Sequence, residues 1–216
     1  MASWIVHLRV ADRLLDRLPG ISPQHFLVGN IGPDCGRVTD TPGEYDPPNR
    51  ITHYSPGGRK RDCQPWRFRD EYLPDQDPAR YSFYLGYYVH LQVDRFWHEW
   101  IFLPIEAANA AYFAEDPARV FVMKQDWYDQ DARFLRDHPD FRAFRMLCAV
   151  QEFPNVYLDF YPRTPLPGRS AILRSSMPPP AGIWSGNTGM SIRPPWTASY
   201  RTQQKKFSGP CSGMAW

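Results

Sequence analysis

The longest apolar pattern in the chain covers residues 78–103 and consists of helix-forming residues throughout. Asp77-Pro78 offers a capping carboxylate followed by a first-turn proline, which is typical of a helix start. After Gly86, neither glycine nor proline interrupts the stretch until Pro104. Apolar and aromatic residues fall on nearly every side of it, as in a helix that is buried on most of its surface. We therefore predict a long buried helix that Pro104 ends.

Three polar residues of this helix, His90, Asp94 and His98, follow one another at intervals of four. Such an interval turns a helix by about 40°, so the three side chains project from successive turns of one face. Burial of a carboxylate is costly unless a partner accompanies it. A divalent metal would be such a partner, and so would a salt bridge to Arg95 or a backbone N–H. The stretch alone leaves these alternatives open.

Shorter amphipathic patterns predict an all-α fold for the rest of residues 1–163. Ser3 can cap a first helix that Pro19-Gly20 ends, and Ser22-Pro23 begins a second one. Further helices are predicted over residues 65–73, 105–114 and 139–153. Another follows Asp116-Pro117, and its predicted apolar side consists of Val120, Phe121, Met123, Trp127, Phe134 and Leu135. The prediction is one multi-helix bundle with long loops.

Two segments rich in glycine and proline interrupt the helical patterns. Residues 28–36, VGNIGPDCG, predict a tight loop that holds Asp34 in a fixed orientation. Asp34 can equally support the turn by capping a backbone N–H. Residues 39–62 predict a long irregular segment, which in a compact domain is usually functional or disordered. His53 lies within it, as a surface residue or as a ligand that the loop brings to the core.

The charges divide the chain unevenly. Residues 1–159 carry 18 basic and 23 acidic residues, a net charge of −5, whereas residues 160–216 carry seven basic residues and no acidic ones. Residues 164–216 are also rich in proline, glycine and serine, which predicts an extended or disordered tail. A basic tail can bind nucleic acid or a membrane surface, but these basic residues are scattered without a cluster, so nucleic-acid binding is not expected.

Neither a signal peptide nor a membrane-spanning segment is predicted. Arg9, Asp12 and Arg13 interrupt the first apolar stretch, and no run of 18 apolar residues occurs anywhere. The four cysteines lie far apart in the sequence, without a Cys-x-x-Cys pair. We therefore expect a cytoplasmic protein with free thiols.

Nitrogen and oxygen ligands for a metal are available from several segments. His90 and Asp94 form a half-site on the long helix, and His53 and Asp34 lie in the two loops. His7 lies beside the apolar stripe of the first helix, where a histidine is more often a hydrogen-bonded core residue. Asp126 and Asp131, on an acidic helix, are also available. Ligands of this kind without cysteine suit zinc or another divalent ion.

Four motifs together resemble the zinc-dependent phospholipase C family, which is related in fold to the P1 nucleases. They are WIVHLRVA at residues 4–11, GNIGPDC at 29–35, ITHY at 51–54 and FYLGYYVHLQVD at 83–94. Each motif alone is weak, but the order His, Asp, His and His-x-x-x-Asp is specific. The resemblance is strongest to small bacterial members without a secretion signal, and it covers roughly residues 4–163.

The resemblance implies a multi-helix phospholipase C/P1 nuclease-like fold and a hydrolase that acts on a phosphoester. The substrate would be a small molecule or a lipid. One Zn²⁺ would be bound by Asp34, His53, His90 and Asp94, and Asp94 would bridge to a second ion bound by His7. A metal-activated water would be the nucleophile, and Asp34 would act as the general base.

The chain also departs from the family pattern at the metal sites. In secreted members the N-terminal tryptophan binds a metal through its amine, whereas Trp4 here is internal. The position of a further zinc-binding histidine is occupied by Trp100, and His98 is the nearest substitute. One or two ions are therefore expected instead of three. The alternatives are a non-catalytic helical protein with a structural metal and an interaction protein that uses its basic tail.

Overall fold

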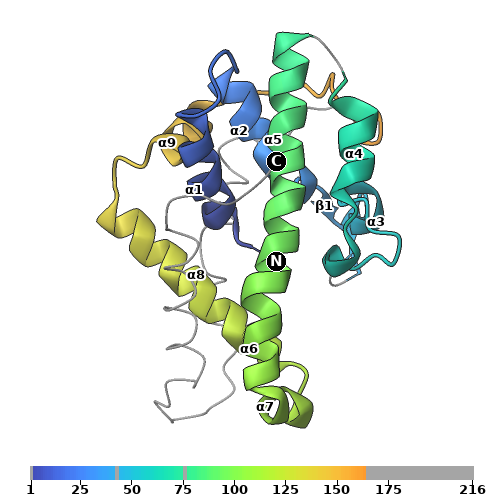
Figure 1. The fold of residues 1–216 in the computed structure, drawn as a ribbon, viewed down its shortest axis with the longest axis vertical. Coiled ribbons are helices and arrows are strands. Elements are labelled where there is room, and N and C mark those ends of the chain that lie inside the picture. The colour runs from blue at the N-terminus through green and yellow to red at the C-terminus, as the bar shows by residue number, and fades with distance from the viewer. Residues whose placement is uncertain (1, 42–43, 75–76, 164–216) are drawn as a thin grey trace.

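Helix α5, Pro78–Trp97, runs through the middle of the molecule, and the other elements are arranged around it (Figure 1). The computed structural model describes residues 2–41, 44–74 and 77–163. Helices α1 and α2 lie on one side of α5, and α3 and α4 lie on the other (Figure 1). The chain order is α1 Trp4–Leu15, α2 Pro23–Ile31, β1 Arg37–Val38, β2 Tyr45–Asp46, α3 Asn49–Thr52, α4 Pro65–Tyr72, α5, α6 Leu103–Ala108, α7 Ala110–Glu115, α8 Arg119–Asp137 and α9 Arg142–Ala149.

The all-α prediction is confirmed for the described part of the chain. Its strands are limited to β1 and β2, a short antiparallel pair in which Arg37 lies opposite Asp46. The predicted caps are also present. The side chain of Ser3 accepts a hydrogen bond from the Val6 N–H at the start of α1, and Asp77 accepts one from Arg80 at the start of α5.

Helices α2 and α5 form the most extensive contact between two elements, and glycine makes it possible. A Cβ atom at Gly29 would lie 2.0 Å from the carbonyl oxygen of Phe83, and one at Gly86 would lie 2.0 Å from that of Phe26. Only hydrogen side chains at these two positions allow the backbones to approach so closely. The crossing therefore sets Asn30 on α2 beside the next turn of α5.

The predicted loop over residues 28–36 is partly wrong, because its first half is helical. Helix α2 continues to Ile31, and Gly32–Asp34 then form a single 3₁₀ turn. Gly29 is there for close packing and not for a turn. The irregular segment 39–62 contains β2, the short helix α3 and a 3₁₀ turn at Lys60–Asp62. His53 directly follows α3 and is fully buried, so it is not a surface residue.

The prediction that Pro104 ends the long helix is also wrong. A π-helical segment, His98–Phe102, follows α5 and leads directly into α6, which holds Pro104 in its first turn. The N–H of Leu103 bonds to the carbonyl of His98, five residues earlier. This wider turn accommodates the proline, which lacks an N–H and would crowd a regular helix.

Two predictions of burial need correction. Phe121, predicted on the apolar side of α8, is 56% exposed, and Trp100 is 43% exposed beyond the end of α5. Met123 and Trp127 of the predicted apolar side are buried, as is Asp131, and the Trp127 indole meets Trp97 of α5 edge to face. The main core thus lies between α5 and its neighbours, and its largest fully buried members are Trp97, Tyr87, Phe26, Phe68 and Phe83.

Other predictions are only partly covered by the structure. Cys35, Cys63 and Cys148 are free thiols, as expected, whereas Cys211 lies outside the described residues. The predicted tail, residues 164–216, also lies outside them, so the division at residue 163 stays a prediction. Within the described residues, no helix combines the length and the apolar character that a membrane crossing requires.

Candidate metal centre

Five side chains from distant parts of the sequence meet where α1, α2, α3 and α5 come together. We call them the His–Asp cluster: His7, Asp34, His53, His90 and Asp94. The three histidines are fully buried, and Asp94 is 2% exposed. Asp34 alone retains access to solvent, with 17% of its side chain exposed. Burying these groups together demands an electrostatic partner for the two carboxylates.

The hydrogen bond of His90 to α2 determines which of its ring nitrogens carries the proton. Its Nδ1 lies 2.7 Å from the backbone carbonyl oxygen of Asn30. A carbonyl oxygen can only accept, so Nδ1 must donate. In the neutral ring, Nε2 therefore presents a lone pair, and it lies 3.8 Å from Asp34 Oδ2 and 3.7 Å from Asp94 Oδ2.

The ring of His90 is held in the neutral state by its surroundings. Burial, and then the neighbouring His7, keep the pKa of His90 well below its usual range near 6.5. The Nε2 lone pair and the carboxylate oxygens consequently face one another as three acceptors. Such an arrangement is repulsive unless a cation lies among them, which is what a metal-binding site provides.

His53 is oriented by the residue that precedes it. Its Nδ1 lies 2.9 Å from the hydroxyl of Thr52, which can accept the proton of that nitrogen. The Nε2 atom is directed into the cluster, 3.3 Å from Asp34 Oδ1 and 3.6 Å from Asp94 Oδ2. Tyr87 of α5 fixes this turn in place by donating a hydrogen bond to the carbonyl of Thr52, at 2.5 Å.

His7 enters the cluster from α1. Its ring stacks on that of His90, with centroids 3.7 Å apart and the planes inclined by 4°. Its Nε2 atom lies 3.4 Å from Asp94 Oδ1, yet neither ring nitrogen makes a hydrogen bond within the described residues. A histidine with both nitrogens buried and unsatisfied is not the hydrogen-bonded core residue that a lone His usually is.

The two oxygens of Asp94 face different histidines. Oδ2 lies near His53 and His90, whereas Oδ1 lies near His7 and accepts a hydrogen bond from the backbone N–H of Ala2 at 3.0 Å. The carboxylate therefore lies between two groups of possible ligands. These groups are His7, His90 and Asp94, and Asp34, His53 and His90, each with its ligand atoms within 4.8 Å of one another.

Four nitrogen–oxygen separations within the cluster are close to those around a tetrahedral ion. Ligands bound to zinc at roughly 2.0–2.2 Å stand about 3.3–3.6 Å apart at the corners of a tetrahedron. The measured nitrogen–oxygen distances among Asp34, His53, His90 and Asp94 run from 3.3 to 3.8 Å. The residue types, the separations and the orphaned nitrogens of His7 and His90 all suit a divalent cation.

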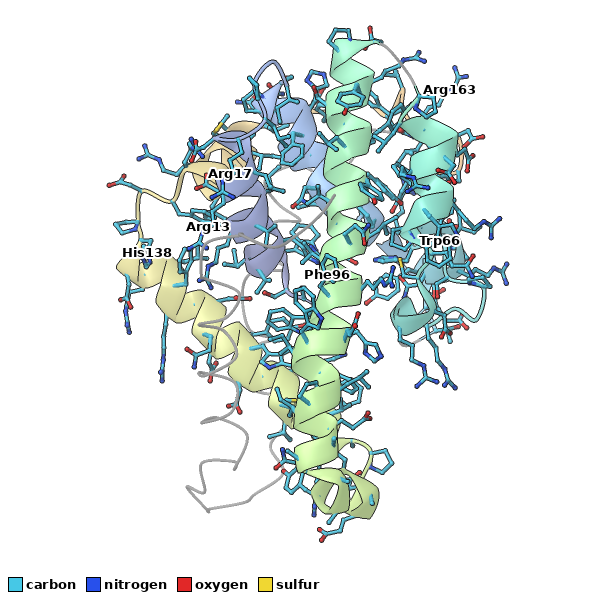
Figure 2. The ribbon with its side chains drawn as sticks, viewed as in Figure 1. Arg13, Arg17, Trp66, Phe96, His138 and Arg163 are labelled. Carbon is cyan, nitrogen blue, oxygen red and sulfur yellow. The ribbon has the colours of Figure 1, made fainter. Side chains whose placement is uncertain are left out.

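Other polar residues considered from the sequence do not join the cluster. His98 belongs to neither group of possible ligands among the described residues, and it stacks on Phe102 instead. Asp131 is buried beside Ser3 and Arg9, and burial raises its pKa to about 7. Asp126 is also absent from both groups. His138 lies exposed at the C-terminal end of α8, which is the end of that helix farther from α5 (Figure 2).

Several residues that support the cluster were missed in the sequence. The indole N–H of Trp4 donates to Asp34 Oδ2 at 3.2 Å, and Thr52, Ala2 and Asn30 supply the contacts described above. Thr52 precedes His53 directly, so its hydroxyl was a detectable signal. The contacts of Ala2 and Asn30 are made by backbone atoms, which every residue has, and therefore carry no sequence signal.

One known protein family covers the part of the chain that contains the cluster. The family model described as zinc dependent phospholipase C matches residues 6–138 of the chain. The protein belongs to this family. The matched range contains the whole His–Asp cluster but not Trp4, and it confirms the resemblance seen in the four motifs. No curated protein and no solved structure matches the chain.

Proposed function

We propose that the protein is a zinc-dependent hydrolase of phosphoesters, with a small molecule or a lipid as substrate. Family membership and the buried histidine and carboxylate groups support a metal-dependent hydrolase. The observation that carries the proposal is the lone pair of His90 Nε2, which faces the carboxylates of Asp34 and Asp94 inside the protein. That arrangement calls for a cation.

The proposed ligands are the five residues of the His–Asp cluster. Asp34, His53, His90 and Asp94 Oδ2 would hold one ion, and Asp94 Oδ1 with His7 offers part of a second site. A bound Zn²⁺ would lower the pKa of a water molecule and neutralise charge on the phosphate. The number of ions is one or two, and another divalent metal can take the same ligands.

Asp34 is the proposed general base of the reaction. It is the only member of the His–Asp cluster with appreciable exposure, so water and substrate would approach past its carboxylate. Its Oδ1 faces His53, and its Oδ2 faces His90 and accepts the hydrogen bond of Trp4. A carboxylate in this position can orient an incoming water and accept its proton.

Replacing Asp94 with asparagine tests the proposal. Asp94→Asn keeps the shape of the side chain but removes the negative charge that faces His7, His53 and His90. We expect zinc content, measured by elemental analysis after dialysis, to fall below half of the wild-type value. Hydrolysis of bis-p-nitrophenyl phosphate should fall at least 100-fold, since the loss of a charged ligand removes a large part of the ion's binding free energy.

The matched control is Asp129→Asn on the exposed side of α8. This substitution makes the same chemical change outside the cluster and should leave both the zinc content and the turnover as in the wild type. A wild-type protein that binds zinc but hydrolyses no phosphodiester, phosphomonoester or phospholipid would contradict the enzymatic part of the proposal.

A structural metal site is the second candidate, and the depth of the cluster favours it. Structural zinc sites have four protein ligands and no open position. Three of the four proposed ligands of the first ion are almost completely buried. Two observations argue against a structural site. Asp34 is partly exposed and His7 lies beside Asp94, and a closed site of four ligands would require neither feature. Metal without turnover would be the result expected of this candidate.

A further inference from the structure

We propose that Trp4 is the positioning residue for Asp34, acting through its indole N–H. This inference rests on the proposed function, because it concerns the carboxylate that would bind the metal and accept the proton. Trp4 is internal in the sequence and its side chain, not its amine, reaches the cluster. Its Nε1 donates to Asp34 Oδ2 at 3.2 Å.

The hydrogen bond matters because Asp34 is the least confined member of the His–Asp cluster. Its side chain is 17% exposed, and it lies at the end of a single 3₁₀ turn instead of inside a long helix. An aspartate in such a place can rotate about its side-chain bonds and turn both oxygens to water. A donor that holds one oxygen leaves the carboxylate with one orientation.

The orientation that results is the one a metal site requires. With Oδ2 bonded to Trp4, Oδ1 is directed inward and lies 3.3 Å from His53 Nε2. The two oxygens thereby acquire different surroundings. Oδ1 faces His53, whereas Oδ2 accepts the indole hydrogen bond and lies 3.8 Å from His90 Nε2. An aspartate that both binds a metal and accepts a proton needs such a distinction.

The backbone that carries Asp34 is held from the opposite side. The hydroxyl of Tyr161 donates to the carbonyl of Gly32 at 2.8 Å, within the same 3₁₀ turn. Trp4 itself is the first residue of α1, the helix that also bears His7. The hydrogen bond of the indole therefore links the turn that carries Asp34 to the helix that carries His7. These two candidate ligands come from distant segments, and the bond holds them in a constant relative position.

The test is the zinc affinity of Trp4→Phe, measured by competition with a chromophoric chelator. Phenylalanine keeps an aromatic ring at the half-buried position but cannot donate a hydrogen bond. We expect the dissociation constant of zinc to rise about tenfold, as for other residues that orient metal ligands. In turnover of bis-p-nitrophenyl phosphate, kcat should fall more than KM rises, because Asp34 would act on the water and not on substrate binding.

Two controls separate positioning from a general loss of structure. Trp66→Phe makes the same substitution on α4, where the indole is 44% exposed and lies at the outer edge of the molecule (Figure 2). It should leave zinc affinity unchanged. In the Asp34→Ala background, Trp4→Phe should weaken zinc binding no further, because the interaction that it removes is already absent.

The outcomes distinguish this inference from the proposed function. Wild-type protein without zinc affinity would defeat both. Zinc binding in the wild type with the same affinity in Trp4→Phe would overturn the inference and leave the proposed function standing. Equal losses from Trp4→Phe with and without Asp34 would also overturn it, since they would show that Trp4 acts on the fold and not on the carboxylate.

Discussion

At the scale of single residues, the cluster depends on hydrogen bonds that orient the imidazole rings of its histidines. His90 is aimed by a backbone carbonyl of α2 and His53 by the hydroxyl of Thr52. In both rings the partner engages Nδ1, which leaves Nε2 to face the carboxylates. Metal sites in proteins commonly orient their histidines in this way, and the orienting groups contribute to affinity.

Thr52→Val should weaken zinc binding about tenfold, because valine has the shape of threonine without the hydroxyl that holds His53. The readout is zinc affinity by chelator competition. Thr39→Val is the matched control, since among the described residues the Thr39 hydroxyl forms exposed hydrogen bonds with the nearby backbone. A folded Thr52→Val protein with wild-type affinity would show that packing alone orients the His53 ring.

At the scale of elements, the crossing of α2 and α5 determines where the cluster forms. Gly29 and Gly86 let the two backbones meet, and the carbonyl of Asn30 then reaches the ring of His90. The helical spacing of His90 and Asp94 was predictable, since an interval of four places two residues on one face. The role of the two glycines was not predictable, because a glycine in a turn and a glycine in a helix crossing look alike in sequence.

Gly29→Ala should destabilise the protein by about 2–3 kcal/mol or more, because the added methyl group overlaps the backbone of Phe83. The better helix propensity of alanine would offset only about 1 kcal/mol of this. Urea unfolding of the metal-free protein measures the change. Gly57→Ala is the comparison: there the new methyl would meet only the end of the Asp62 side chain, which can move, so its effect should be smaller.

At the scale of the whole molecule, stability and pH are linked through two buried groups of opposite behaviour. The pKa of His90 is lowered in the folded state, so the unfolded chain binds more protons as the pH falls below about 6.5. Its contribution to stability is therefore present at higher pH and lost as the pH falls. The pKa of Asp131 is raised from 3.8 to about 7. Its contribution is present at low pH and lost as the pH rises through 7.

Asp131→Asn separates the two contributions in the metal-free protein. Without the carboxylate, the unfolding free energy should rise with pH between about 5 and 7, because the lowered pKa values of His90 and of the less buried His25 and His98 are then no longer opposed by Asp131. The unfolding free energy of the wild type should rise less steeply. Between pH 4 and pH 8 it should fall by about 4 kcal/mol relative to that of the variant, because the shift of about three pKa units corresponds to about 1.4 kcal/mol per unit. Urea unfolding at several pH values measures both curves, and parallel curves would contradict the assignment to Asp131.

Features that depend on neighbours along the chain could be predicted from local patterns. Caps at Ser3 and Asp77, the long helix, and the pairing of His90 with Asp94 all follow from local periodicity and could be predicted. The family motifs added the candidate ligands in loops. The continuation of the helix past Pro104 could not be predicted from local patterns, because a π-helical turn accommodates a residue that normally ends a helix.

Which of those candidate ligands meet, and in what geometry, depends on the packing of distant segments. His7 and Asp94 are 87 positions apart, and whether their side chains touch depends on how helices pack, which no local pattern records. The same packing directs the Nδ1 atom of His90 to a carbonyl and leaves its Nε2 facing two carboxylates. A hydrogen bond from His90 to a distant backbone carbonyl thus turned a helical half-site into a candidate site for a cation.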